Sequence, residues 1–103
     1  MNRPFQNLES SGPLVFDGLA AVCWFVNMTS DVTSPRSINI APGQLYTFVF
    51  TQNGTGGNRM NWPVNCRNAP PIDLTPLSTT VQNFVGSTGG VMYANLSPAW
   101  NQP

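Results

Sequence analysis

Side chains that could carry out acid–base or nucleophilic chemistry are few in this sequence and lie far apart. The 103 residues include four arginines and four acids but neither lysine nor histidine. Hydrolysis by paired carboxylates needs two acids about 5–10 Å apart in one cleft, and a serine or cysteine nucleophile needs a base beside it. The sequence therefore predicts a protein that is not an enzyme and that binds no cofactor. The four acids, each in a separate segment, are Glu9, Asp17, Asp31 and Asp73.

The two cysteines, Cys23 and Cys66, predict no metal site. A structural zinc site needs about four Cys or His ligands, and this chain has no histidine. Cys23 lies within an apolar segment, and Cys66 lies near a predicted loop. We expect two free thiols; the alternative is a disulfide, which requires an oxidising compartment.

A glycine-rich cluster, Asn53–Gly57 (NGTGG), is the remaining candidate for a ligand site. A phosphate-binding loop continues with Lys and Ser or Thr and opens a helix, whereas Asn58, Arg59 and Met60 follow this cluster. Asn-Gly is instead a strong hairpin signal, because glycine adopts positive φ without steric cost. We therefore interpret the cluster as a turn in which Gly57 has positive φ.

This turn predicts a hairpin between two strands, Leu45–Gln52 and Asn58–Trp62. Cross-strand pairs of bulky side chains each contribute about 0.2–1 kcal/mol to such a hairpin. A five-residue loop would bring the large side chains of both strands onto one face. In this register Phe50 lies opposite Met60, and Phe48 lies opposite Trp62.

The rest of the chain also has a β pattern. No segment has helical periodicity, and ten prolines and nine glycines punctuate the sequence. Short β-branched and aromatic runs alternate with turn clusters, which is typical of a sandwich or barrel. We predict an all-β fold, an antiparallel β-sandwich of jelly-roll type, formed by residues 14–103 as a single domain. The other expected strands are Leu14–Phe16, Leu19–Met28, Ser37–Ile40, Ile72–Leu74, Thr80–Val85 and Val91–Leu96.

Residues 1–13 have no clear period and contain two prolines, which predicts an extended N-terminal arm. The arm either frays or lies as a strap on a neighbouring subunit. The strand Leu19–Met28 is apolar on both faces, so we expect the arm or another subunit to cover its second face. The residues expected at an oligomer or capsid contact are Phe5, Leu8, Leu19, Ala21 and Phe25.

The composition narrows the possible partners. Only 8% of the residues are charged and the net charge is zero, so no basic cluster is available for nucleic acid. No apolar run reaches the roughly 18–20 residues of a membrane span. The sequence begins with Met1 and lacks the pattern of a signal peptide, so we expect synthesis in the cytoplasm. Such low charge favours a subunit packed against copies of itself over a weakly charged monomer.

Two segments resemble small β-rich modules of tailed-bacteriophage structural proteins. They are YTFVFTQNGTGGNRMNWP (residues 46–63) and APPIDLTPLSTT (residues 69–80), and the resemblance covers residues 42–91. Beyond Thr80 the sequence departs from the modules, because VQNFVGSTGGVMY is shorter than their final strand region. The resemblance implies a virion component. We expect a capsid decoration (cement) protein or head-fibre subunit, a homotrimer that contacts itself and the major capsid protein.

The alternative function is a tail-fibre or spike module that recognises glycans of the host surface. Aromatic rings flanked by Asn and Thr can stack on sugars, and the candidates are Tyr93 and Trp100. The alternative for Trp100 is a purely structural role, tucked under the edge of the sandwich. A third reading is an accessory subunit of the neck or baseplate.

Overall fold

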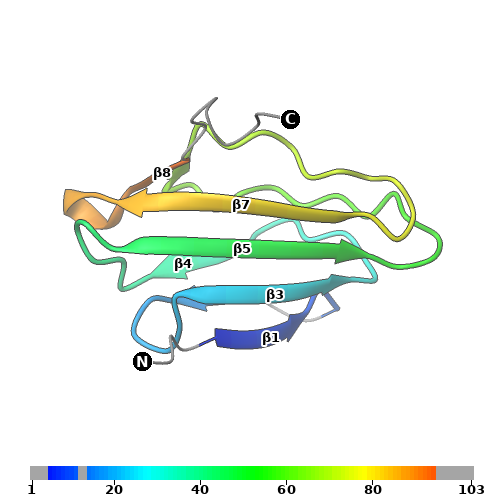
Figure 1. The fold of residues 1–103 in the computed structure, drawn as a ribbon, viewed down its shortest axis with the longest axis horizontal. Coiled ribbons are helices and arrows are strands. Elements are labelled where there is room, and N and C mark those ends of the chain that lie inside the picture. The colour runs from blue at the N-terminus through cyan, green and yellow to red at the C-terminus, as the bar shows by residue number, and fades with distance from the viewer. Residues whose placement is uncertain (1–4, 12–13, 95–103) are drawn as a thin grey trace, which may run out of the picture.

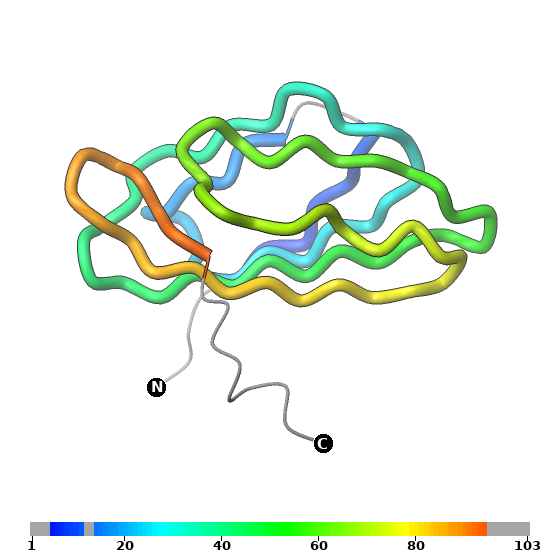
Figure 2. Tube along the Cα trace, turned by 90° about the horizontal axis from the view of Figure 1, so that it is seen from above, coloured from blue at the N-terminus to red at the C-terminus, as the bar shows by residue number. Residues whose placement is uncertain are grey.

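The computed structural model describes residues 5–11 and 14–94, which form two layers of chain (Figures 1 and 2). One layer is a six-stranded sheet. The second layer contains a two-stranded sheet and long irregular segments. The strands are β1 (Phe5–Glu9), β2 (Val15–Asp17), β3 (Cys23–Met28), β4 (Arg36–Ile38), β5 (Leu45–Gln52), β6 (Cys66–Arg67), β7 (Thr79–Gly86) and β8 (Met92–Ala94), and a short 3₁₀ turn, η1 (Thr88–Gly90), precedes β8.

The large sheet is mixed, with the strand order β1-β3-β5-β7-β8-β6. β1, β3 and β5 run parallel to one another, whereas β7 is antiparallel to β5 (Figure 1). The all-β class is confirmed, but the antiparallel arrangement is wrong for these three strands. The physical reason is the connection between β3 and β5, which crosses the second layer through β4 and returns to the same end of the sheet.

Aromatic side chains fill the space between the two layers. On β5, Tyr46, Phe48 and Phe50 are all buried, which confirms that the aromatic face of this strand points into the core. Phe48 lies at the centre: its ring centroid is 4.8 Å from that of Phe16 and 4.9 Å from that of Trp24. The even positions of β5 thus form the core side of the sheet, as side-chain alternation along a strand requires.

The predicted hairpin between β5 and residues 58–62 is wrong. β5 pairs with β7 instead, with Phe50 opposite Thr80 and Phe48 opposite Gln82. Residues 58–62 cross into the second layer, where Met60 forms a single parallel bridge with Val32.

The turn itself explains why the chain leaves the sheet. Gly56 and Gly57 have φ of +69° and +73°, so the positive φ predicted at Gly57 is confirmed. The buried side chain of Gln52 then holds the departing segment: its Nε2 donates to the Asn58 carbonyl (2.8 Å), and its Oε1 accepts from the Asn58 N–H (3.2 Å). The chain is therefore directed over the sheet and not alongside it.

Residues 5–9 of the predicted arm form a strand of the same chain. β1 pairs with β3 from Phe5 opposite Cys23 to Glu9 opposite Asn27. The hydroxyl of Ser10, which is buried, then accepts hydrogen bonds from the N–H groups of the turn after β3. The arm is thus corrected to an edge strand, because pairing within the chain satisfies its backbone groups.

Candidate interaction surface

One face of the six-stranded sheet points away from the second layer, and we call it the outer face. Alternation places every second side chain of each strand on this face. Val81 is 58% exposed there, and Phe5 and Phe25 are 60% and 40% exposed. The apolar side chains of the outer face are Phe5, Phe25, Leu45, Val49, Val81, Val85 and Tyr93.

These apolar side chains form two rows across the strands. Phe25, Val49 and Val81 are register neighbours on β3, β5 and β7. Leu45, Val85 and Tyr93 are register neighbours on β5, β7 and β8. Since cross-strand neighbours on one face lie about 4.5–5.5 Å apart, each row is continuous. The ring of Phe5 extends the first row at its β1 end, where it meets Phe25 edge to face at 5.8 Å.

Among the described residues, the charged side chains of the outer face lie at its two edges. The four inner strands, β3, β5, β7 and β8, contain no Asp, Glu, Lys or Arg. Glu9 lies on edge strand β1, where it accepts a hydrogen bond from Asn27 Nδ2 (2.8 Å), and Arg67 lies on edge strand β6 opposite the exposed Tyr93. The centre of the face is thus apolar with neutral polar groups, such as Thr47, whose hydroxyl donates to Asn83 Oδ1 (2.8 Å).

The structure brings together some of the predicted contact residues and separates others. Phe5 and Phe25 meet on the outer face. Leu19 is 82% exposed but lies in the turn between β2 and β3, outside the strands of the sheet. Leu8 points inward and packs against the core of its own chain, so its role as a strap on a neighbour is corrected. Ala21 is 1% exposed and cannot make a subunit contact.

The turn before β3 explains the error at Ala21. The N–H groups of Ala20 and Ala21 both donate to the Asp17 carbonyl (3.0 and 3.1 Å), and the Leu19 N–H donates to Asp17 Oδ1 (2.9 Å). The chain is therefore coiled where a strand was predicted, and the alternation begins only at Cys23. Side-chain parity counted back from Phe25 does not extend through such a turn.

Several residues of the outer face were missed by sequence reasoning. Leu45, Val81 and Val85 are exposed apolar residues on strands whose other face is buried. The signal was present in the sequence, because these strands carry apolar residues at odd as well as even positions. Of the two proposed glycan contacts, Tyr93 is exposed on the outer face, and Trp100 lies outside the described residues.

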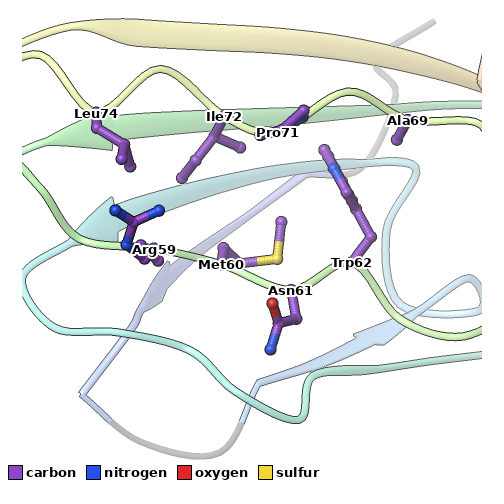
Figure 3. A pocket seen from close by; sticks show the side chains of 8 residues that line it. All are labelled: Arg59, Met60, Asn61, Trp62, Ala69, Pro71, Ile72 and Leu74. Carbon is purple, nitrogen blue, oxygen red and sulfur yellow. The ribbon is translucent and has the colours of Figure 1, made fainter.

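A pocket of about 370 Å³ lies between residues 59–62 and 69–74 of the second layer (Figure 3). Met60 and Ile72 form its buried apolar floor, and Trp62 forms a wall. The two segments are joined by hydrogen bonds from the Gly57 N–H to the Leu74 carbonyl (2.8 Å) and from Trp62 Nε1 to the Pro70 carbonyl (2.8 Å). The pocket walls are therefore held in place by the fold.

The ionisable groups within the described ranges do not gather into a metal-binding cluster. No group of three or more His, Cys, Asp or Glu side chains gathers in the described part of the chain. Burial raises the pKa of the Cys66 thiol to about 12, against a smaller opposing effect of its hydrogen bond with Ser37. Hydrogen bonds from the Asn39 side chain and the Leu19 N–H lower the pKa of Asp17. Cys23 and Cys66 are not joined in a disulfide.

Comparison with known proteins finds no matching family model, no matching curated protein and no matching solved structure. Among the residues described, no helix has the length and apolar character needed to cross a membrane.

Proposed function

We propose that this protein is a structural subunit of a bacteriophage virion, a capsid decoration (cement) protein or head-fibre subunit that assembles with copies of itself. The observation that carries the proposal is the outer face, an apolar surface whose charged groups, among residues 5–11 and 14–94, lie at its edges. A contiguous exposed apolar patch of this kind is typical of an interaction site. The resemblance of residues 46–63 and 69–80 to phage structural modules indicates the setting, a virion assembled from proteins made in the host cytoplasm.

The mechanism is mechanical and involves no chemical reaction. Burying apolar surface contributes about 25 cal/mol for each Å² removed from water. A contact that forms only in the assembled particle stabilises that particle by mass action. Copies of the chain, and the major capsid protein beneath them, are the partners. The expected homotrimer stays a prediction, as does the jelly-roll arrangement. The two layers favour a sandwich, whereas the parallel pairing of β1, β3 and β5 departs from a jelly roll, whose strands are antiparallel.

Labelling on virions tests the location. A tagged copy of the protein, detected by electron microscopy with an electron-dense label, should lie on the capsid. Label confined to tail fibres or to the neck would contradict the capsid assignment. Binding of the purified protein to capsids that lack it adds a quantitative measurement, in which Val81→Asp should bind at least tenfold more weakly than the unaltered protein.

Recognition of a host-surface glycan is the second candidate function, and the pocket beside Trp62 favours it. Its volume is near the lower end of the roughly 300–1,000 Å³ typical of ligand sites, and Arg59 and Trp62 supply a charged and an aromatic group. Glycan-array binding that is lost in Arg59→Ala or Tyr93→Ala, but kept in Val64→Ala, would support this function. An array without binding would exclude the sugars that it carries.

A further inference from the structure

The positions of the two charged residues on the outer face carry an inference about how two copies meet. This inference rests on the proposed function in one respect, namely that a second copy of the chain buries the outer face. Register places Glu9 in one row with Asn27, Thr51 and Thr79 across the sheet. The row that contains Arg67 joins Tyr93, Val85 and Leu45 at the opposite end of β5.

Glu9 and Arg67 therefore occupy diagonally opposite corners of the outer face. Glu9 and Arg67 lie at opposite sides of the sheet, because β1 and β6 are its two edge strands. They also lie at opposite ends of the strands, because the row of Glu9 crosses β5 at Thr51 and the row of Arg67 crosses β5 at Leu45. The apolar row of Val49 and Val81 lies between the two corners, and the apolar row of Val85 ends at the Arg67 corner.

The dimensions of this face allow a small but stable contact. Six strands at a spacing of about 4.8 Å span roughly 24 Å, and the rows from Leu45 to Thr51 span roughly 20 Å. The flat footprint is thus about 500 Å², before the relief of the side chains is counted. The smallest stable interfaces bury about 600 Å² on each partner, so the contact must use the whole face together with the added area of its side-chain relief.

We propose that two copies of this chain pack outer face to outer face around a twofold axis, with Glu9 of each copy beside Arg67 of the other. The axis lies in the plane of the contact and is perpendicular to the diagonal between the two corners. Rotation about this axis exchanges the corners, so that a carboxylate meets a guanidinium at both ends of the contact. Two like charges would face each other at each end if the copies were related by an axis along the diagonal.

The same rotation fixes how the strands cross. The diagonal lies at roughly 45–50° to the strands, given the dimensions above, so the strands of the two copies cross near a right angle. Orthogonal packing is one of the two arrangements that stacked sheets adopt. Both apolar rows are then buried by the partner, and the two ion pairs lie at the rim. Rim charges select the orientation of a contact more than they strengthen it.

A second copy fits this surface better than a charged partner. The centre of the face has no charge with which an acidic or basic partner could pair. Burying an unpaired charge of the partner there would be unfavourable, whereas the apolar rows of a copy are complementary to it. The charges at the edges also hinder pairing through the strand edges, which leaves the face as the surface for association.

Charge exchange tests the arrangement, with self-association measured by sedimentation equilibrium of the full chain. Glu9→Arg and Arg67→Glu should each raise the dimer Kd at least tenfold, because each places like charges together at both ends. The double variant should return the Kd to within about threefold of the unaltered protein. An equimolar mixture of the two single variants should associate more tightly than either variant alone, since a mixed dimer has opposite charges at both ends.

The outcomes separate this inference from the proposed function. Single variants that associate normally, or a double variant that does not recover, would overturn the twofold arrangement. If Val81→Asp still abolished association in that case, the outer face would remain the contact surface with a different geometry. A species with three times the 11.2 kDa mass of the chain would also overturn the twofold pair, in favour of a trimer.

Discussion

Phe48 and Trp62 meet edge to face with ring centroids 5.5 Å apart and ring planes at 90°, although they belong to different layers of the protein. Phe48 is in β5, in the middle of the six-stranded sheet, and Trp62 is in the irregular segment that crosses over it. Trp62 also meets Phe50 at 5.3 Å and Phe84 at 5.2 Å. This one indole therefore joins the second layer to two neighbouring strands, β5 and β7.

Replacing Trp62 should weaken the packing between the two layers and so lower the free energy of unfolding. Trp62→Ala removes three ring contacts and the hydrogen bond to the Pro70 carbonyl, so we expect a loss of about 3 kcal/mol in the free energy of unfolding. Trp62→Phe keeps a ring in place and loses the hydrogen bond, and it should cost about 1 kcal/mol. Urea denaturation followed by circular dichroism measures both. Equal losses in the two variants would show that the ring contacts contribute little.

Gly56 and Gly57 should respond differently to substitution, although both have positive φ. A Cβ at Gly56 would lie 2.7 Å from the Leu74 carbonyl oxygen and 2.7 Å from the Pro76 nitrogen, whereas a Cβ at Gly57 would meet nothing within 4 Å. We expect Gly57→Ala to cost about 1 kcal/mol from backbone strain alone. Gly56→Ala should cost more, because the backbone must also move. Denaturant midpoints provide the comparison, and a Gly57→Ala variant that is less stable than Gly56→Ala would contradict it.

Gln52 is a buried amide that links three segments. Its Nε2 donates to the carbonyls of Asn58 and Asp73, and its Oε1 accepts from Asn58. Gln52→Leu keeps the size of the side chain and removes these hydrogen bonds, including those to the N–H and carbonyl of Asn58, so the free energy of unfolding should fall by about 2 kcal/mol. Gln44→Leu, which removes one exposed hydrogen bond to the Leu45 carbonyl, is the matched control and should change it by less than about 0.5 kcal/mol. Similar changes in the free energy of unfolding for both variants would show that the hydrogen bonds of Gln52 do not hold the three segments together.

Cys66 should make stability fall at alkaline pH. Its pKa is raised to about 12 in the folded protein, and a thiol in the unfolded chain has a pKa of about 8.5. Between these values the unfolded state has lost a proton that the folded state keeps, so stability decreases as pH rises through this range. Urea midpoints of a Cys23→Ser variant should decline from pH 8 to pH 11. The decline should be smaller in Cys23→Ser/Cys66→Ala, which provides the control.

The reactivity of the Cys66 thiol follows from the same burial. At pH 8 roughly one thiol in ten thousand is ionised when the pKa is about 12, and only the thiolate reacts with disulfide reagents. In the Cys23→Ser variant we expect labelling at least a hundredfold slower in native buffer than in denaturing urea. Equal rates would show that Cys66 is accessible in the folded protein.

The sequence was informative where side chains decide the structure locally. The alternation of β5 predicted its buried aromatic face, and the glycine cluster predicted positive φ at Gly57. The partners of β5 were not predictable in this way, because a strand pattern specifies which face is buried and says nothing about its neighbours. The meeting of Phe48 with Trp62 shows the consequence: the contact was expected across a hairpin, and it forms between layers.

The candidate surface was predicted only in part for a similar reason. Phe5 and Phe25 were identified because they are large and lie in apolar or arm-like segments. Val81 and Val85 were not identified, since their exposure depends on which side of β7 the second layer covers. Ala21 was misplaced because one turn before β3 interrupted the alternation.

Self-association of a matched pair of variants tests the role of the outer face most directly. Val81 is 58% exposed at the centre of the outer face, and Val64 is 93% exposed in the turn before β6, outside both apolar rows. Size-exclusion chromatography with light scattering, at tens of micromolar protein, should show an oligomer for the unaltered chain and for Val64→Asp. Val81→Asp should be a folded monomer, because a carboxylate at that position would be buried without a partner. An unaltered chain that is monomeric under these conditions, or a Val81→Asp variant that associates as well as Val64→Asp, would contradict the account.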